Sequence, residues 1–247
     1  MKSTFLLFAT FTTASASAQV VLTGPGTYSQ DFDSLASTGT GIGWTNNLPT
    51  ALMPGWYSSA STYDADNGTA SVSGQYSYGL TGSGERALGS VALNGALLRY
   101  GMQISNASGG TFGSFSLSYT GEQWKSGAAI ADMLTFEYST NATSLTTGTW
   151  TSVSALDFNS PNNSGSGVLN GELAANRSFQ SSTITGLNWT NGTDVWVRWT
   201  HIGNASRDSP PLDDMKLNAT PAPEPTTFAA LSLAGFGLSR GRKRKLG

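Results

Sequence analysis

The body of this chain alternates apolar and polar residues with a period of two, and this pattern constrains the fold more than any other feature. The clearest runs are residues 114–120, 134–138 and 195–199. A period of two puts successive side chains on opposite faces of an extended chain, so each run predicts a strand with one buried face. Between residues 19 and 218, no stretch sustains the 3.6-residue apolar period of a helix for three turns.

Turn signals separate these runs. The chain has 30 glycines, and Asn-Gly pairs begin at Asn67, Asn94, Asn170 and Asn191. Weaker alternation predicts further strands at 29–32, 70–73, 86–93, 98–104, 152–156, 178–184 and 215–218, whereas residues 36–65 have little strand pattern. Many short strands in 247 residues predict an all-β protein with a single β-sandwich domain, residues 19–218, of jelly-roll type.

The first eighteen residues predict a signal peptide. Lys2 supplies the positive start, Phe5 to Phe11 a short apolar core, and Ala16-Ser17-Ala18 a small-residue cleavage site. We therefore expect export through the Sec machinery and a mature chain that starts at Gln19. A buried first helix is the alternative.

The C-terminal end has three parts in the reverse order. Residues 219–225 form a Pro-rich linker, residues 226–239 are apolar and almost uncharged, and residues 240–247 carry the cations Arg240, Arg242, Lys243, Arg244 and Lys245. Cations after an apolar run hold that end in the cytoplasm during export, so we expect a short transmembrane helix as a transient inner-membrane anchor. The alternative is a hydrophobic C-terminal strand with a solvated basic tail.

This end resembles the PEP-CTERM sorting signal of Gram-negative bacteria. The resemblance is carried by Pro223-Glu224-Pro225, the short apolar helix and the terminal basic cluster, about the last 25 residues. It implies that the protein is an exosortase substrate, delivered to the cell surface or to the extracellular polysaccharide matrix. By the same resemblance, Pro223, Glu224 and Pro225 form the recognition element.

Composition excludes several function classes. The chain has no cysteine and only one histidine, His201, so disulfide scaffolds, thiolate sites and two-histidine metal sites are excluded. Six of the 13 basic residues lie in the two end segments, which leaves an acidic body without the basic patch that nucleic-acid binding requires. No catalytic motif is found; the remaining hydrolase candidates are His201 in a triad and a glycosidase pair of Glu122 and Glu137.

Asp213 is the candidate metal ligand. In a regular strand it shares a face with Met215 and Leu217, and a buried carboxylate needs a partner. Phe32-Asp33-Ser34-Leu35, Pro54-Gly55-Trp56 and the strand 212–217 resemble the first and last strands of secreted jelly-roll domains. That resemblance implies a structural calcium held by Asp213 with Asp31 or Asp33. The alternatives are a turn cap after Pro210-Pro211 and a pair with Arg207.

Together, the body and the two end segments predict an exported, non-enzymatic protein of the cell surface or extracellular matrix. The alternative is a carbohydrate-binding module, in which Trp44, Trp56 or Trp124 stacks on a sugar. For the aromatic residues within 36–65, packing against the sandwich is the competing interpretation. A secreted hydrolase is the third hypothesis about function.

Overall fold

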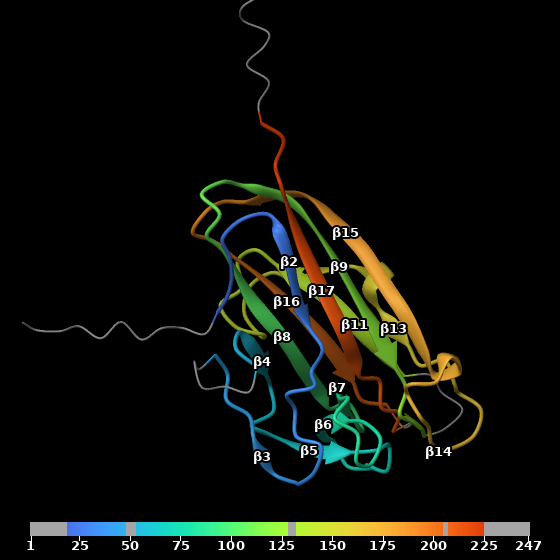
Figure 1. The fold of residues 1–247 in the computed structure, drawn as a ribbon. Coiled ribbons are helices and arrows are strands. Elements are labelled where there is room, and N and C mark those ends of the chain that lie inside the picture. The colour runs from blue at the N-terminus through green and yellow to red at the C-terminus, as the bar shows by residue number, and fades with distance from the viewer. Residues whose placement is uncertain (1–18, 48–52, 128–131, 205–206, 225–247) are drawn as a thin grey trace, which may run out of the picture.

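The computed structural model describes residues 19–47, 53–127, 132–204 and 207–224, which form two β-sheets packed face to face (Figure 1). Helical structure in these ranges consists of two 3-10 turns, η1 (Ser154–Leu156) and η2 (Ala174–Asn176). The predicted all-β class and sandwich arrangement are thereby confirmed. The predicted signal peptide (1–18), the anchor segment (226–239) and the basic tail (240–247) lie outside the described residues.

A seven-stranded sheet forms one layer. Its main path is β1-β8-β16-β11-β12, with β4 paired to β8 and β13 paired to β11. The pairs are antiparallel except for β1, which runs parallel to β8. The strands are β1 (Val20–Leu22), β4 (Trp56–Ser58), β8 (Leu97–Asn106), β11 (Met133–Ser139), β12 (Thr151–Ser152), β13 (Phe158–Asn159) and β16 (Asp194–Ile202).

An eight-stranded sheet forms the other layer, with the path β15-β9-β17-β7-β6-β5-β3 and β2 paired to β17. Its strands are β2 (Gly26–Gln30), β3 (Ile42–Gly43), β5 (Thr62–Asp66), β6 (Gly74–Tyr78), β7 (Ala87–Val91), β9 (Phe112–Glu122), β15 (Arg177–Trp189) and β17 (Leu212–Pro221). A separate small ribbon pairs β10 (Lys125–Ser126) with β14 (Gly167–Val168).

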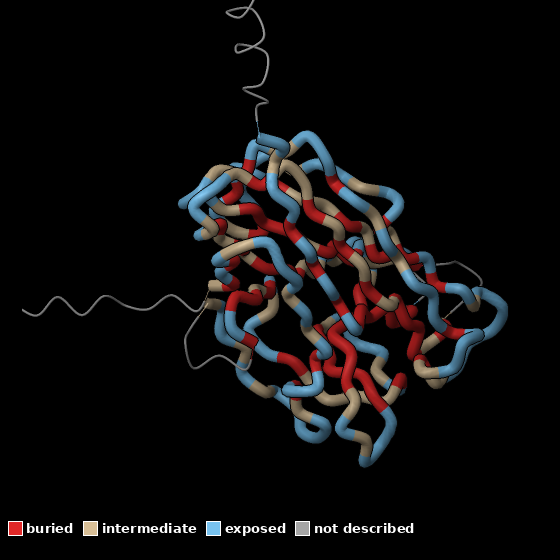
Figure 2. The backbone as a smooth tube through the Cα atoms, turned by 45° about the horizontal axis from the view of Figure 1, so that its top comes forward, coloured by how far each residue is buried: buried red, intermediate tan, exposed pale blue. Residues whose placement is uncertain are grey.

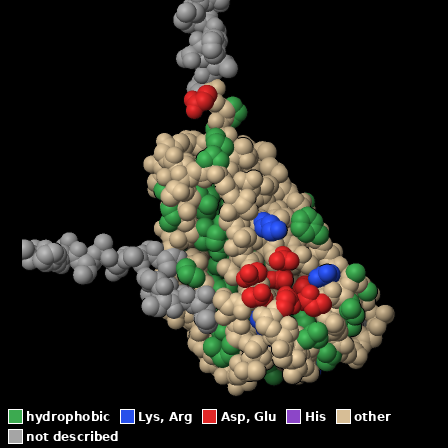
Figure 3. All heavy atoms as spheres, viewed as in Figure 1, with side chains coloured by type: hydrophobic (Ala, Val, Ile, Leu, Met, Phe, Trp, Pro, Cys, Tyr) green, Lys and Arg blue, Asp and Glu red, His purple; other side chains and the backbone are tan. Residues whose placement is uncertain are grey.

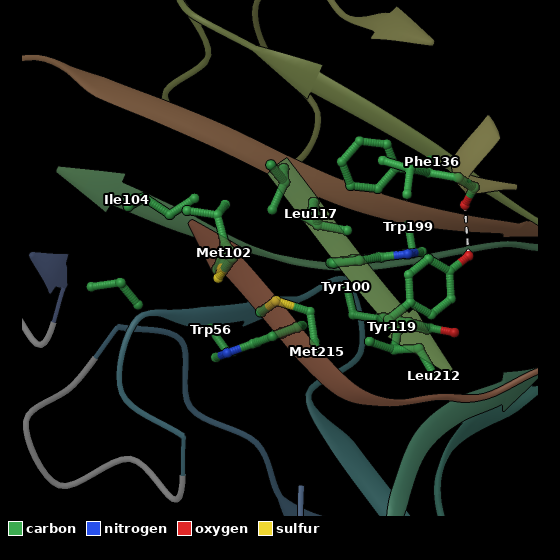
Figure 4. Close-up of a cluster of buried hydrophobic side chains, with 14 of the residues drawn as sticks. Trp56, Tyr100, Met102, Ile104, Leu117, Tyr119, Phe136, Trp199, Leu212 and Met215 are labelled. Carbon is green, nitrogen blue, oxygen red and sulfur yellow. Dashed lines mark hydrogen bonds between the residues drawn. The ribbon is translucent and has the colours of Figure 1, made fainter. Parts of the chain in front are cut away.

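The core lies between the two layers, where the inward side chains of both sheets meet. The buried positions along the tube in Figure 2 alternate with exposed ones, as the period-two pattern predicts. Figure 4 shows the centre of this core: Trp199 stacks on Trp56, with ring centroids 5.8 Å apart, and Tyr119 and Phe136 meet Trp199 edge to face. The Tyr119 hydroxyl donates a hydrogen bond to the Leu156 carbonyl at 2.6 Å.

Two boundaries differ from the prediction. The segment 36–65, where alternation is weak, supplies β3, β4 and β5, because these short strands are held by longer neighbours. At the other end, β17 runs to Pro221, and the Ala222 N–H donates to the Thr111 carbonyl at 2.8 Å. The first four residues of the predicted linker therefore belong to the sandwich. Within the described ranges, no helix has the length and apolar character needed to cross a bilayer.

Candidate functional site

A bulge in β17 decides where Asp213 points. Leu212 pairs with Gly121 and Asp213 with Thr120, but Lys216 pairs with Ser118, so β17 carries one extra residue. Asp214 takes a φ of 50° at this place. Without the bulge, Asp213 would face the core with Met215, as predicted. With it, Asp213 lies beside Thr120 on the outer face of the eight-stranded sheet, although its side chain is still buried.

Three glutamates gather on the same outer face, at the end of β9 and in the loops beside it. Carboxylate oxygens of Glu85, Glu122 and Glu172 all lie within 4.8 Å of one another, and Asp213 interacts with Glu85. We call Glu85, Glu122, Glu172 and Asp213 the acidic cluster. Figure 3 shows Asp and Glu side chains gathered in one patch on the face of the molecule that carries β17.

Glu122 has the most unusual environment in the acidic cluster. It is fully buried, and its Oε2 accepts a hydrogen bond from Trp124 Nε1 at 2.7 Å. Its Oε1 is buried and has no hydrogen-bond partner. A buried carboxylate oxygen without a donor is costly, so it marks a place where a proton or a cation would stabilise the fold.

Three carboxyl groups of the acidic cluster, Glu85, Glu122 and Asp213, favour their neutral forms when no cation is bound. Burial raises the pKa of Glu122 from 4.5 to about 8; the Trp124 hydrogen bond opposes this shift, and the charges of Glu172 and Asp213 add to it. Burial also raises the pKa of Asp213. The pKa of Glu85 is raised first by burial and then by Glu172 and Asp213. A bound cation would therefore be needed to favour the charged forms of these groups.

The predicted calcium ligands come together only in part. Asp213 joins the acidic cluster, whereas Asp31 Oδ1 accepts the Asp33 N–H and Asp33 Oδ1 accepts the Arg86 N–H. Asp31 and Asp33 are not among the carboxylates that lie within 4.8 Å of one another. The donors of the acidic cluster are all carboxylate oxygens, and three of them, on Glu122, Glu172 and Asp213, are buried without a hydrogen-bond partner. This donor set fits a hard cation such as Ca²⁺.

Two of the three predicted stacking tryptophans are buried. Trp56 lies in the core against Phe32 and Trp199, and Trp124 packs on Tyr78. Neither presents a ring face to a polysaccharide, so the prediction is corrected for both: β4 points Trp56 inward, and Gly68 and Gly171 approach Trp124 closely. Trp44 is half-buried, edge to face with Tyr63.

The outer face of the seven-stranded sheet carries other aromatic residues. Tyr57 follows Trp56 in β4 and points to the opposite side, where it lies across Gly101 of β8. Its ring packs on Trp196 at a centroid distance of 4.6 Å, and Trp150 packs against the same small cluster. Tyr57 and Trp150 are both half-buried, so each keeps part of its ring in contact with solvent.

Polar side chains hold these rings in place. The Tyr57 hydroxyl donates to Gln103 Oε1 at 2.9 Å, and Gln103 Nε2 donates to Asp194 Oδ2 at 2.6 Å. Arg198 lies over the Trp150 ring at 3.9 Å, and its Nη2 is 2.7 Å from Glu137 Oε2. We call Tyr57, Trp150, Arg198, Gln103 and Arg99 the aromatic face. Rings flanked by fixed hydrogen-bonding groups are suited to binding a sugar chain.

The remaining hydrolase candidates do not form an accessible site. His201 Nδ1 lies 2.8 Å from Ser90 Oγ, and its Nε2 lies 3.0 Å from Asp132 Oδ2. This is a Ser-His-Asp chain, but Ser90 and His201 are fully buried between the two sheets and Asp132 is 2% exposed. A substrate cannot reach Ser90 in this conformation. The hydrogen-bonded series Ser90–His201–Asp132 therefore links the two sheets.

The proposed glycosidase pair is also separated. Glu122 lies on the outer side of the eight-stranded sheet, in the acidic cluster. Glu137 lies on the outer side of the seven-stranded sheet and pairs with Arg198. Two acids on opposite sides of a sandwich cannot flank one glycosidic bond.

Part of the predicted sorting signal is described. Pro223 and Glu224 follow the last hydrogen bond of the sandwich, and with residues 221 and 222 they border a hollow of about 370 Å³ that is also lined by Gly110, Thr111 and Asn188. Pro225, Arg240, Arg242, Lys243, Arg244 and Lys245 lie outside the described residues.

No family model and no curated protein matches this chain. Among solved structures, it is similar to two xylan-binding domains of Paenibacillus barcinonensis Xyn10C. The CBM22-2 domain has a TM-score of 0.44 at 9% identity, covering 78% of this chain and 99% of that domain. The CBM22-1 domain has a TM-score of 0.42 at 9% identity, covering 82% of this chain and 99% of that domain.

A third similar structure is the K3 cleaved adhesin domain of Lys-gingipain from Porphyromonas gingivalis, with a TM-score of 0.38 at 11% identity, covering 57% of this chain and 78% of that domain.

Proposed function

We propose that this protein is a non-catalytic polysaccharide-binding module that binds a glycan on its aromatic face. The observation that carries the proposal is the placement of two half-exposed rings, Tyr57 and Trp150, on one side of the seven-stranded sheet. Sugar rings present flat apolar patches of C–H groups edged by hydroxyls. Aromatic faces cover the patches, and side chains such as Gln103 and Arg198 hydrogen-bond the edges.

The aromatic face is organised before any ligand arrives. Tyr57 is held by packing on Trp196 and by its hydrogen bond to Gln103, and Trp150 is held by Arg198 and by a hydrogen bond from its Nε1 to the Thr147 carbonyl at 2.7 Å. Ligand binding therefore costs little ordering of these side chains, which favours affinity. As part of the same function, we propose that the sandwich is of the jelly-roll type and that the module catalyses no reaction.

Alanine at Trp150 or Tyr57 is expected to weaken polysaccharide binding by at least about tenfold, because each removes ring contact that the polar neighbours cannot replace. Affinity electrophoresis against a panel of neutral and acidic polysaccharides, followed by titration calorimetry, measures the change. Phe179→Ala is the matched control, since Phe179 is 67% exposed but lies on β15 of the opposite sheet. The proposal fails if no polysaccharide retards the wild-type protein, or if both variants bind as the wild type does.

The acidic cluster has a separate proposed role as a structural cation site. Asp213, Glu85, Glu122 and Glu172 would hold a calcium ion, which would offset their mutual repulsion and satisfy the orphaned Glu122 oxygen. The ion would join β9, β17 and the loops that carry Glu85 and Glu172. Its role is to stabilise the sandwich; the aromatic face lies on the other sheet.

We further propose that the module is exported and sorted by an exosortase to the cell surface or the polysaccharide matrix. The support is in the sequence: the signal-like start, Pro223-Glu224-Pro225, the apolar segment and the terminal cations. Mass spectrometry of the protein from its native host is expected to find a chain that begins at Gln19 and lacks the basic tail. A cytosolic protein that retains both Met1 and Gly247 would overturn this proposal and leave the glycan proposal intact.

A further inference from the structure

The aromatic face contains a cation, Arg99, that forms no ion pair with a described residue. Arg99 lies on β8, two residues before Gly101, and pairs across the sheet with Thr200 of β16. Its neighbour Tyr100 is a buried core residue, so by alternation the Arg99 side chain lies on the outer face with Tyr57 and Arg198. The other arginine of this face, Arg198, is paired with Glu137.

No Asp or Glu of the described residues lies within ion-pair distance of Arg99. All Asp and Glu residues of the sequence lie in the described ranges, and the ion pairs there that involve arginine are Arg177 with Glu172 and Arg198 with Glu137. The Arg99 Nε is buried and has no hydrogen-bond partner among the described residues. A guanidinium group with an unused buried donor is costly to keep, unless a ligand completes it.

Burial and the nearby cation Arg198 both disfavour the charge of Arg99, and a bound anion would offset both effects. Burial lowers the pKa of Arg99, the like charge of Arg198 lowers it further, and Glu137 opposes both effects. The two carboxylates of the face are already engaged, Glu137 with Arg198 and Asp194 with Gln103. The acidic cluster lies on the outer side of the other sheet, where it cannot repel a ligand on the aromatic face at short range.

We propose that Arg99 binds the carboxylate of an acidic sugar unit, so that the ligand of the aromatic face is a uronate-containing polysaccharide. The planar guanidinium matches a carboxylate with two parallel hydrogen bonds, a geometry that a hydroxyl group cannot reproduce. Tyr57 and Trp150 bind the sugar rings, and Arg99 selects the charged unit. This inference rests on the proposed glycan-binding function.

The test compares two ligands that differ at their carboxyl groups: oligogalacturonate and the same oligomer with these groups methyl-esterified, which removes the charge. Wild-type protein is expected to bind oligogalacturonate at least about tenfold more tightly than the ester, because a hydrogen bond to a charged group contributes more than a neutral one. Arg99→Gln is expected to abolish this preference, because it weakens binding of oligogalacturonate more than binding of the ester. Arg99→Lys, which keeps the charge but loses the planar fork, should restore only part of it.

Lys216→Gln is the matched control, because Lys216 is an exposed cation on the outer side of the opposite sheet and its loss should change neither affinity. Equal binding of the acid and the ester by wild-type protein, or an Arg99→Gln variant that keeps the preference, would overturn the inference about Arg99 alone. Binding of neither oligomer, nor of any polysaccharide in the wider panel, would overturn the proposed function itself. Equal losses in Arg99→Gln and Lys216→Gln would show general charge attraction, which also contradicts a specific contact.

Discussion

Trp199→Ala is expected to lower the free energy of unfolding by about 3–5 kcal/mol, the range for removing a large aromatic side chain from a packed core. Trp199 is fully buried and contacts rings from both sheets: Trp56 at 5.8 Å, Tyr119 at 5.6 Å and Phe136 at 5.1 Å between centroids. Its loss would leave a cavity that extended strands, fixed by their ladders, cannot collapse to fill. Urea unfolding followed by circular dichroism measures the change.

Two variants make this prediction specific. Phe179→Ala removes a ring that is 67% exposed and should cost less than about 0.5 kcal/mol. Trp199→Phe keeps an aromatic ring in the core and should cost less than Trp199→Ala. If Trp199→Ala unfolds at the same urea concentration as the wild type, the ring cluster does not stabilise the sandwich as described.

Without divalent cations, the folding stability of the protein is expected to depend strongly on pH. The folded-state pKa of Glu122 is raised to about 8 from 4.5. The stability that its neutral form contributes is therefore fully present below about pH 4.5 and is lost as the pH rises toward 8. For this fully buried group the loss is at most about 5 kcal/mol, at about 1.4 kcal/mol per pKa unit. In EDTA, the melting temperature should therefore fall between pH 5 and pH 8.

Calcium is expected to reverse this fall, because the ion favours the charged carboxylates that the cation-free cluster disfavours. At a hundred times its Kd, a bound ion adds about 2.7 kcal/mol. Glu122→Gln is the informative variant: it should flatten the pH dependence in EDTA and reduce the gain from calcium. Arg177→Gln, which removes the ion pair to Glu172 at the edge of the cluster, should leave a calcium response. Identical melting temperatures with EDTA and with calcium at pH 8 would rule out the cation site.

The side of the strand on which Asp213 lies could not be predicted from the sequence. Regular alternation puts Asp213 on the core side with Met215, where a buried carboxylate would need a partner. The extra residue at Asp214 reverses the side on which Asp213 lies, and a bulge of this kind has no distinct signature in one sequence. The sequence therefore indicated that Asp213 is unusual, and the register of β9 decided that its neighbours are Glu85, Glu122 and Glu172.

The aromatic residues illustrate the same limit for the glycan site. Trp56 and Tyr57 are adjacent, so one of them had to point inward and the other outward, and alternation alone does not say which. The pairing of β4 with β8 places Trp56 opposite Met102 of the core and Tyr57 opposite Gly101. The signal that could have indicated Tyr57 was the glycine in β8, because a ring often covers a glycine on a neighbouring strand.

The sequence alone determined the fold class, because alternating apolar and polar residues with glycine-rich turns favour strands. It also excluded disulfides, thiolate sites and two-histidine metal sites, because the chain has no cysteine and only one histidine. Such inferences need only neighbours along the chain, and a single sequence contains them. The acidic cluster, the buried Ser90–His201–Asp132 chain and the unpaired Arg99 each depend on which strands lie side by side. Pairing between distant segments is decided by packing and register, so only the tertiary structure shows those sites.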